Sequence, residues 1–182
     1  MTGAGGGGST RRRPSRRTLP ARYAIGVRNE QTHLSVPAGR IRRIARLALA
    51  AEQVAAATIS VALVDNRAIH CLNRRHLNHD YETDVLSFLF ESEPGTPGTA
   101  EGPGQPRGAG RRIDGEIVIS AEMALQAAPR FGWSPAEEFA LYLVHGLLHL
   151  CAYDDTTDAE RRLMKQRERA ILNLLGRNLL GD

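Results

Sequence analysis

The sequence predicts an α/β (or α+β) protein, in which a single mixed β-sheet packs against helices and one central, buried helix carries a pair of histidines. Three observations indicate this class. Strand-like runs alternate with amphipathic helical segments, some strands follow one another directly, and one helix is apolar on nearly all sides. The chain has 182 residues, 42% of them hydrophobic, which suits one domain with a substantial core.

Composition separates a folded body from low-complexity segments. Residues 1–22 are rich in Gly, Arg and Ser, so we expect a disordered basic tail. Residues 23–176 read as a single domain, interrupted at 91–112 by a flexible insertion whose first 20 positions are half Gly or Pro. Residues 177–182 read as a C-terminal tail. No run of about 18 apolar residues occurs that would cross a membrane.

The formal net charge of +4 hides a separation of charge along the chain. Residues 1–22 carry six Arg and no acid, and residues 28–46 carry five Arg and one Glu. From Leu47 onward, 13 basic groups face 19 acidic ones. All cations but Lys165 are arginines, which suits contact with phosphate. A GC-rich coding sequence would give the same bias, so both interpretations stay open.

The first half of the domain alternates strands and helices. An apolar face every three to four residues predicts the first helix, and Asp65 is placed to cap the second. Period-two alternation and runs of β-branched residues predict the strands. The expected elements are strands at 23–29, 58–64, 85–90 and 113–119, and helices at 37–52 and 65–77.

Start and stop signals define three further helices. Ser120 caps a helix that runs through Phe131 and is closed by Gly132. Ser134-Pro135-Ala136-Glu137 has the capping-box pattern with proline at the first helical position, and it opens a helix through Cys151. A second capping box at 157–160 opens a last helix to Leu175, with Gly176 as its stop.

Two histidines lie in the apolar helix. His145 and His149 are four residues apart, so their rings project from one face, one turn apart. This spacing suits two imidazole ligands of one metal ion. The alternative is a pair of core histidines that hydrogen-bond to neighbouring groups.

A carboxylate follows the pair at the spacing of a third ligand. His145-x3-His149-x5-Asp155 has the pattern of a three-ligand zinc site with an open fourth position, and spacing favours Asp155 over Asp154. Metal-dependent proteases share the spacing but need a Glu after the first His as general base. Gly146 occupies that position, which argues against a protease. Gly146 allows either close packing against a strand or the approach of another chain.

Two other polar blocks are candidates for the same site. In the first, Asp84 lies among the polar residues of a helix-to-strand turn, and Asp84 and Glu116 are both candidates for the general base. In the second, Glu116 lies in a strand of β-branched residues and either faces the site or faces solvent. Ordinary turn chemistry would also explain the first block.

These blocks resemble the motifs of the YbeY family of endoribonucleases. The stretch His145–Asp155 is similar to the family signature H-G-x-L-H-L-x-G-Y-D-H. Leu72-Asn73 with 83–88 resembles its second motif, and 115–120 its third. The three motifs occur in the family's order, and the resemblance covers about residues 23–175.

The resemblance implies a metal-dependent, single-strand-specific endoribonuclease of the bacterial cytoplasm. It implies maturation of the 3′ end of 16S rRNA and a part in ribosome quality control, with the small ribosomal subunit, ribosomal proteins or assembly proteins as partners and no membrane. It also implies one zinc ion held by His145, His149 and Asp155. The catalytic candidates are then His145, Glu116 and Asp84. The candidate RNA-binding residues are Arg40, Arg43, Arg74 and Arg75. The oligomeric state stays open.

The chain departs from the family pattern at three positions. Asp155 replaces the third histidine, which shifts the preference toward harder divalent metals. Ala152 replaces a glycine, at a cost of roughly 1 kcal/mol if the position is left-handed. Leu77 replaces an arginine that follows the Leu-Asn motif. Two alternatives therefore stay open: a ribosome-assembly factor that binds RNA without cutting it, and a metallohydrolase of another substrate such as a peptide.

Overall fold

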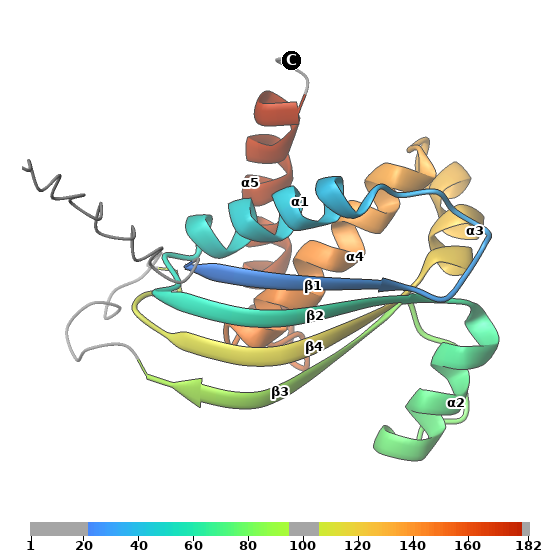
Figure 1. The fold of residues 1–182 in the computed structure, drawn as a ribbon, viewed down its shortest axis with the longest axis horizontal. Helices are drawn as coiled ribbons and strands as arrows, with labels where there is room; N and C mark the ends of the chain where they lie inside the picture. The colour runs from blue at the N-terminus through green and yellow to red at the C-terminus, as the bar shows by residue number, and fades with distance from the viewer. Residues whose placement is uncertain (1–21, 95–105, 180–182) are drawn as a thin grey trace, which may run out of the picture.

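The computed structural model describes residues 22–94 and 106–179 and forms one sheet with helices on both faces (Figure 1). The alternation of strands and helices expected from the sequence is confirmed. In chain order the elements are β1 Tyr23–Asn29, α1 Ala38–Ala51, β2 Ala56–Val64, α2 Asn66–Leu77, β3 Val85–Glu93, β4 Arg112–Ser120, α3 Ala121–Phe131, α4 Pro135–Leu150 and α5 Asp158–Leu179.

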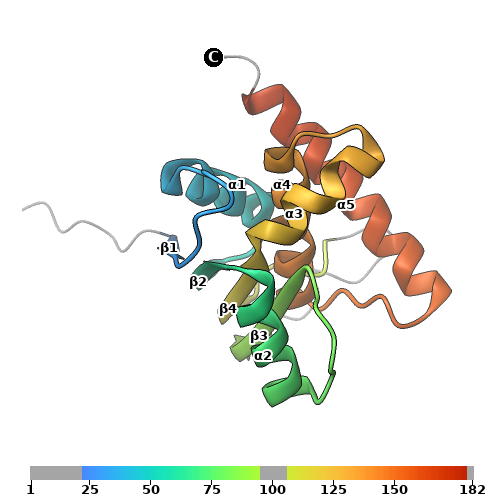
Figure 2. The same cartoon turned by 90° about the vertical axis from the view of Figure 1, so that its right-hand side faces the viewer.

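The sheet is mixed, with strand order β1-β2-β4-β3. The first three strands in this order run parallel, and β3 pairs antiparallel with β4 at one edge. Helices α1, α3, α4 and α5 lie on one face of the sheet, whereas α2 lies on the other (Figures 1 and 2). No helix in the described ranges is long and apolar enough to cross a membrane.

Two apolar cores result from this arrangement. The main core fills the space between the sheet and the four-helix layer, and it includes Phe139, Leu143 and Leu147 of α4. A smaller core lies under α2 and is formed by Ala62, Val64, Ile69, Leu86 and Val118. Because α2 is short, it covers only part of its face, and the rest of that face is exposed.

The helix boundaries follow the capping signals. Asp65 accepts a hydrogen bond from the backbone N–H of Ala68, and Ser120 accepts one from Met123. The capping box of Ser134 and Glu137 forms reciprocally. Gly132 ends α3 in the left-handed conformation, with φ of 70°. The side-chain caps satisfy N–H groups that the first turn of a helix leaves unpaired, and the N–H of Gly132 satisfies carbonyl oxygens of the last turn of α3.

Several boundaries differ from the expectation, and β2, for example, begins at Ala56 rather than at residue 58. The last helix continues through Gly176 to Leu179, because one glycine costs only about 1 kcal/mol within a helix and does not end it. Strand β3 extends to Glu93 and β4 begins at Arg112, so both ends of the predicted insertion pair with each other. Residues 95–105 lie outside the described ranges.

The structure describes only the edges of the predicted N-terminal and C-terminal tails. Residues 1–21 and 180–182 lie outside the described ranges, so the predicted tails are described only from Arg22 and up to Leu179. The guanidinium of Arg22 donates to the backbone carbonyls of Val54 and Ala55.

Candidate metal centre

Helix α4 lies unusually close to the sheet at Gly146. A Cβ atom at this position would lie 3.0 Å from Ile117 Cγ2 and 3.0 Å from Ser87 Oγ. The hydroxyl of Ser87 also donates to the carbonyl oxygen of Gly146, at 3.1 Å. The glycine therefore serves helix–strand packing, one of the two roles left open by the sequence. A catalytic side chain has no room at this position.

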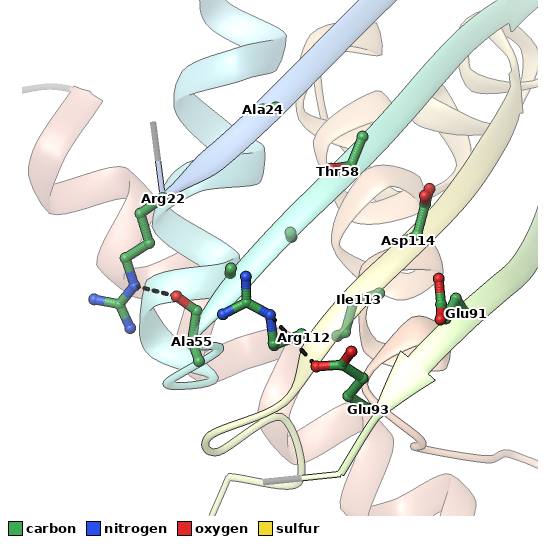
Figure 3. A pocket seen from close by; sticks show the side chains of 11 residues that line it. Arg22, Ala24, Ala55, Thr58, Glu91, Glu93, Arg112, Ile113 and Asp114 are labelled. Atoms are coloured by element: carbon green, nitrogen blue, oxygen red, sulfur yellow. Dashed lines mark hydrogen bonds and ion pairs between the residues drawn. The ribbon is translucent and has the colours of Figure 1, made fainter. Parts of the chain in front are cut away.

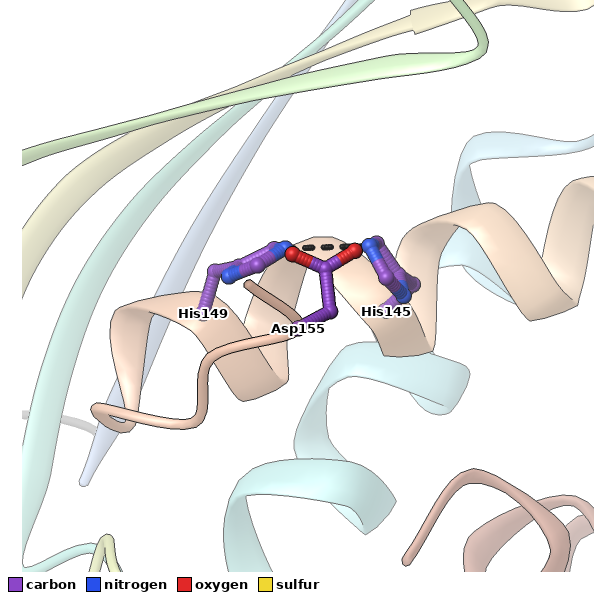
Figure 4. A group of neighbouring side chains, drawn as sticks. All are labelled: His145, His149 and Asp155. Carbon is purple, nitrogen blue, oxygen red and sulfur yellow. Dashed lines mark hydrogen bonds between the residues drawn. The ribbon is translucent and has the colours of Figure 1, made fainter. Parts of the chain in front are cut away.

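The neighbouring histidines project from a different face of α4, and their rings meet. Nε2 of His145 lies 3.0 Å from Nε2 of His149, and the ring planes are nearly perpendicular, at 84°. Asp155 places its carboxylate beside both rings (Figure 4). One ligand atom from each of the three side chains lies within 4.8 Å of the other two. The structure thus brings together the three residues that the sequence predicts as ligands.

Both histidines are held through their outer ring nitrogen. Nδ1 of His145 lies 2.7 Å from Oε1 of Glu168 on α5, and Nδ1 of His149 lies 3.1 Å from the carbonyl oxygen of Tyr153. A carbonyl oxygen and a carboxylate accept hydrogen bonds, so both Nδ1 atoms donate. In the neutral rings, the Nε2 lone pairs then point at each other and at the Asp155 carboxylate.

This donor set fits a cation. Two facing lone pairs and a carboxylate repel one another unless a proton or a metal ion lies between them. Two imidazole nitrogens and one oxygen, with a fourth position left to water or substrate, form a common arrangement for a catalytic divalent ion. The carboxylate on the far nitrogen of His145 is the partner that metal-ligating histidines usually have.

The two rings differ in their affinity for protons. Burial disfavours the charged form of His145, but the hydrogen bond and charge of Glu168, together with the charges of Asp84 and Asp155, raise the pKa of His145 overall. Burial, followed by the charge of His145, lowers the pKa of His149. His149 is therefore held in the neutral form that binds metals.

The turn after α4 brings Asp155 back to the rings. Ala152 has a φ of 71°, in the left-handed region, as the family glycine at this position suggests. Asp154 is not part of the three-residue group. Its carboxylate accepts hydrogen bonds from the backbone N–H of Asp155 and from the hydroxyl of Thr156. The preference for Asp155 over Asp154 agrees with this geometry.

Tyr153 anchors the same turn in the core. Its hydroxyl donates to Oε2 of Glu52, at 3.0 Å, and Arg167 of α5 donates to the other oxygen of that carboxylate. Arg107 lies over the tyrosine ring and donates to the carbonyl oxygen of Ala152. Burial raises the pKa of Tyr153 to about 12, so the hydroxyl remains a donor.

The sequence did not reveal Glu168 or the Glu52–Arg167 ion pair. Glu168 is 23 residues from His145 and lies on another helix, and Glu52 is 101 residues from Tyr153. The sequence places Glu52 at the end of a helix but contains no signal that its side chain is buried. Both partnerships depend on how α5 crosses α4 and α1.

The two candidate general bases lie on opposite sides of the sheet edge. Asp84 immediately precedes β3, and its charge contributes to the raised pKa of His145. Glu116 alternates on β4 with Gly115 and Ile117, which face α4. Glu116 therefore faces the side of the sheet that carries α2. The charge of Asp84, but not that of Glu116, acts on His145.

The four candidate RNA-binding arginines separate into two groups. Arg40 lines a hollow with Trp133 and Glu137 near the start of α4, about 12 Å along the helix from His145. Arg43 lies on the same helix, α1. Arg74 and Arg75 lie on α2, where Arg74 is 3.9 Å from Asp80. The structure does not gather the four into one surface.

The fold and the three-residue group together define an α/β protein with a candidate mononuclear metal site of the hydrolase type. The model of the family described as Endoribonuclease YbeY matches residues 26–176, and the chain belongs to this family. Relatives with this description include one from Salinibacter ruber, 33% identical over 85% of this chain and 95% of its own length.

A further relative supports this assignment, and one solved structure supports the fold. An Endoribonuclease YbeY from Moorella thermoacetica is 42% identical over 75% of this chain and 85% of its own length. The solution structure of a Thermotoga maritima protein superimposes with a TM-score of 0.54, at 19% identity, over 85% of this chain and 91% of that one. At that identity the superposition supports the fold.

Proposed function

We propose that the protein is an endoribonuclease that holds one divalent ion at His145, His149 and Asp155 and cleaves single-stranded RNA. The observation that carries the proposal is the convergence of two Nε2 atoms and one carboxylate within 4.8 Å. When bound, the ion acts as a Lewis acid toward the scissile phosphate and neutralises the charge that develops there. Zinc suits the two imidazoles, and a harder divalent metal is the alternative because of Asp155.

The side chains around the group have separate tasks in this proposal. Glu168 and the carbonyl of Tyr153 orient the rings, and the buried turn holds Asp155. Asp84 is the general-base candidate, because it is the predicted carboxylate whose charge acts on His145. In metal-dependent proteases a glutamate directly follows the first histidine ligand. Here Gly146 occupies that position and packs against the sheet, which argues against a peptide substrate.

The biological setting follows from family membership. We propose rRNA of the small ribosomal subunit as the substrate, with maturation of the 16S 3′ end and ribosome quality control as the processes. The proposed location is the cytoplasm, and ribosomal or assembly proteins are the proposed partners. The exposed Leu77, in place of the family arginine, favours the second candidate, an assembly factor that binds RNA without cutting it.

Metal analysis of the purified protein, followed by cleavage of a single-stranded RNA with and without chelator, tests the proposal. His149→Ala should abolish both metal binding and cleavage while leaving the circular dichroism spectrum unchanged. His33→Ala is the matched control, because His33 lies near Glu122 of α3 rather than in the group. Undiminished cleavage by metal-free protein would overturn the proposal. Bound metal without cleavage would favour the assembly factor.

A further inference from the structure

A hollow lies on the sheet face that α2 only partly covers. It has a volume of about 520 Å³ and lies between α2 and the strands, with Leu72, Arg75 and His76 on one side and Phe88, Phe90 and Glu116 on the other. We call it the α2–β3 hollow. Its size, and its apolar lining with a few polar groups, are those of pockets that bind small organic groups.

Two phenylalanines give this hollow aromatic walls. Phe88 pairs with Glu116 across the sheet, and the register shift between Leu89 and Glu91 leaves Phe90 unpaired. Phe90 is 65% exposed, and the ring of His76 meets Phe88 edge-on with centroids 5.5 Å apart. The chain has only four phenylalanines, and half of them lie here. Exposed aromatic faces of this kind stack on unpaired nucleobases.

The charges inside the hollow are balanced. Arg28 donates to Glu30 at 2.8 Å and lies 4.0 Å from Glu116, and Arg75 is the other cation of the lining. A balanced lining suits a neutral base better than a phosphate. A free carboxylate oxygen of Glu116 can accept the N–H groups on a base edge, and a guanidinium can stack on a base.

The helix beside the hollow supplies charge for the backbone. Between residues 66 and 79 the sequence has three arginines, three histidines and no acid. Arg75, which lines the hollow, complements the phosphates on either side of a bound base, whereas His70 and Arg74 lie beside Asp80.

The hollow at the other end of the same sheet face has three acids in its lining, Glu91, Glu93 and Asp114, and two arginines, Arg22 and Arg112 (Figure 3). Arg112 lies 3.5 Å from Glu93, so the net charge of this end is slightly negative.

The α2–β3 hollow and the metal-bearing helix α4 lie on opposite faces of the sheet, and β3 contacts both. β3 is an edge strand, and its Ser87 contacts Gly146 of the metal-bearing helix. The next residue, Phe88, faces the hollow on the other side of the sheet. A nucleic acid strand that crosses this edge can place a phosphate at the histidines and a nearby base in the hollow.

We infer that the α2–β3 hollow binds one unpaired base of the single-stranded RNA whose backbone reaches His145, His149 and Asp155. The inference rests on the proposed function and adds a base-binding subsite to it. It also gives a physical reason for single-strand specificity, because a base inside a duplex is stacked and paired and cannot enter the hollow.

Binding of a short, unstructured, labelled oligoribonucleotide to the full-length protein, in chelator so that no cleavage occurs, tests the inference. Phe90→Ala should weaken binding about ten-fold, the usual effect of removing one stacking ring. Phe131→Ala is the matched control, because Phe131 is also 65% exposed but lies at the end of α3. Unchanged affinity in Phe90→Ala, or an equal loss in Phe131→Ala, would overturn the inference.

Cys71 offers a second readout, because it is exposed and lines the hollow, whereas Cys151 is buried. Single-stranded RNA should slow alkylation of Cys71, and a duplex of the same sequence should not. Equal protection by the duplex would contradict an unpaired-base site. Equal protection by a nucleoside monophosphate would show that the hollow takes free nucleotides instead of the RNA strand.

These measurements separate the inference from the proposed function. If Phe90→Ala weakens binding but the wild-type protein fails to cut RNA with metal present, the endonuclease proposal fails and the base site stands. If cleavage is metal-dependent but Phe90→Ala binds normally, the base site fails alone. A loss caused by Phe90→Ala should persist at high salt, whereas a loss caused by Arg75→Ala should shrink.

Discussion

The carboxylate of Glu168 lies 2.7 Å from Nδ1 of His145 and joins α5 to the helix that carries both histidines. The side chain of Glu168 is only 12% exposed and that of His145 is 23% exposed, so little water competes for this hydrogen bond. The contact fixes the ring orientation and leaves Nε2 free. Glu168 is therefore a positioning residue for the metal centre.

Replacing Glu168 should weaken metal binding without removing a ligand. We expect Glu168→Ala to lower zinc affinity about 10- to 100-fold, as is usual when the outer partner of a ligating histidine is lost. Glu168→Gln should lose less, because its amide oxygen can still accept the Nδ1 hydrogen. Competition with a chromogenic chelator measures both. Asp158→Asn, at the exposed start of α5, should leave the affinity unchanged. An equal loss there would point to a general charge effect.

Asp155 should set the strength and the selectivity of the site. Asp155→Ala should weaken zinc binding more than Glu168→Ala does, because it removes one of the three ligands. Asp155→His should raise the preference for zinc over manganese, since imidazole nitrogen is a softer donor than a carboxylate oxygen. Titration calorimetry with both metals gives this ratio. Asp154→Asn is the control, and a similar change in that variant would show that the effect is not specific to the Asp155 side chain.

The left-handed residue after α4 should limit stability. At a φ of 71°, Ala152 carries a steric cost that glycine avoids. Ala152→Gly should therefore raise the free energy of unfolding by about 0.5–1 kcal/mol, after the greater freedom of glycine in the unfolded chain is deducted. Urea denaturation measures the change. Ala170→Gly, at an exposed position within α5, should instead cost about 1 kcal/mol. Destabilisation in both variants would refute the argument.

Glu138 and Glu137 should respond to pH with opposite signs. Burial, and to a smaller extent the charge of Asp84, raises the pKa of Glu138 in the folded protein. Glu138 therefore contributes fully to stability at pH values below its pKa in the unfolded chain, and this contribution is lost as the pH rises through its pKa in the folded protein. Hydrogen bonds from Ser134 lower the pKa of Glu137, so its contribution is present above the unfolded pKa and is lost at low pH.

Thermal unfolding from pH 4 to pH 8 tests this difference. Glu138→Gln should raise the melting temperature near pH 7 and lose that advantage toward pH 4, because the buried charge is then already neutralised. Glu137→Gln should give no gain near pH 7. A pH-independent effect of Glu138→Gln would show that packing, rather than charge, decides stability at this position.

Local signals in the sequence determined most of the fold. Apolar periodicity and capping residues such as Asp65, Ser120 and Ser134 predicted the helices, because these interactions join residues three or four positions apart. The same holds for the metal group. His145 and His149 share one helix face by spacing alone, and Asp155 follows within a single turn of chain.

Long-range contacts decided the rest. The sequence predicted Glu116 as a catalytic candidate, but strand alternation could not say which face of the sheet would carry α4. It left two roles open for Gly146, and the close approach of Ile117 and Ser87 selected packing. It did not reveal that Phe88 and Phe90 line a hollow with α2, because that depends on where the helix packs on the sheet.

The sequence by itself thus determined the family, the order of the elements and the three candidate ligands, because short-range geometry and residue chemistry are enough to specify them. Only the tertiary structure decided that Glu168 orients His145, that Glu52 and Arg167 anchor the ligand turn, and that the aromatic hollow lies on the opposite face of the sheet from the metal-bearing helix. These relationships join residues that are distant in sequence, and they arise from how the helices cross the sheet and one another.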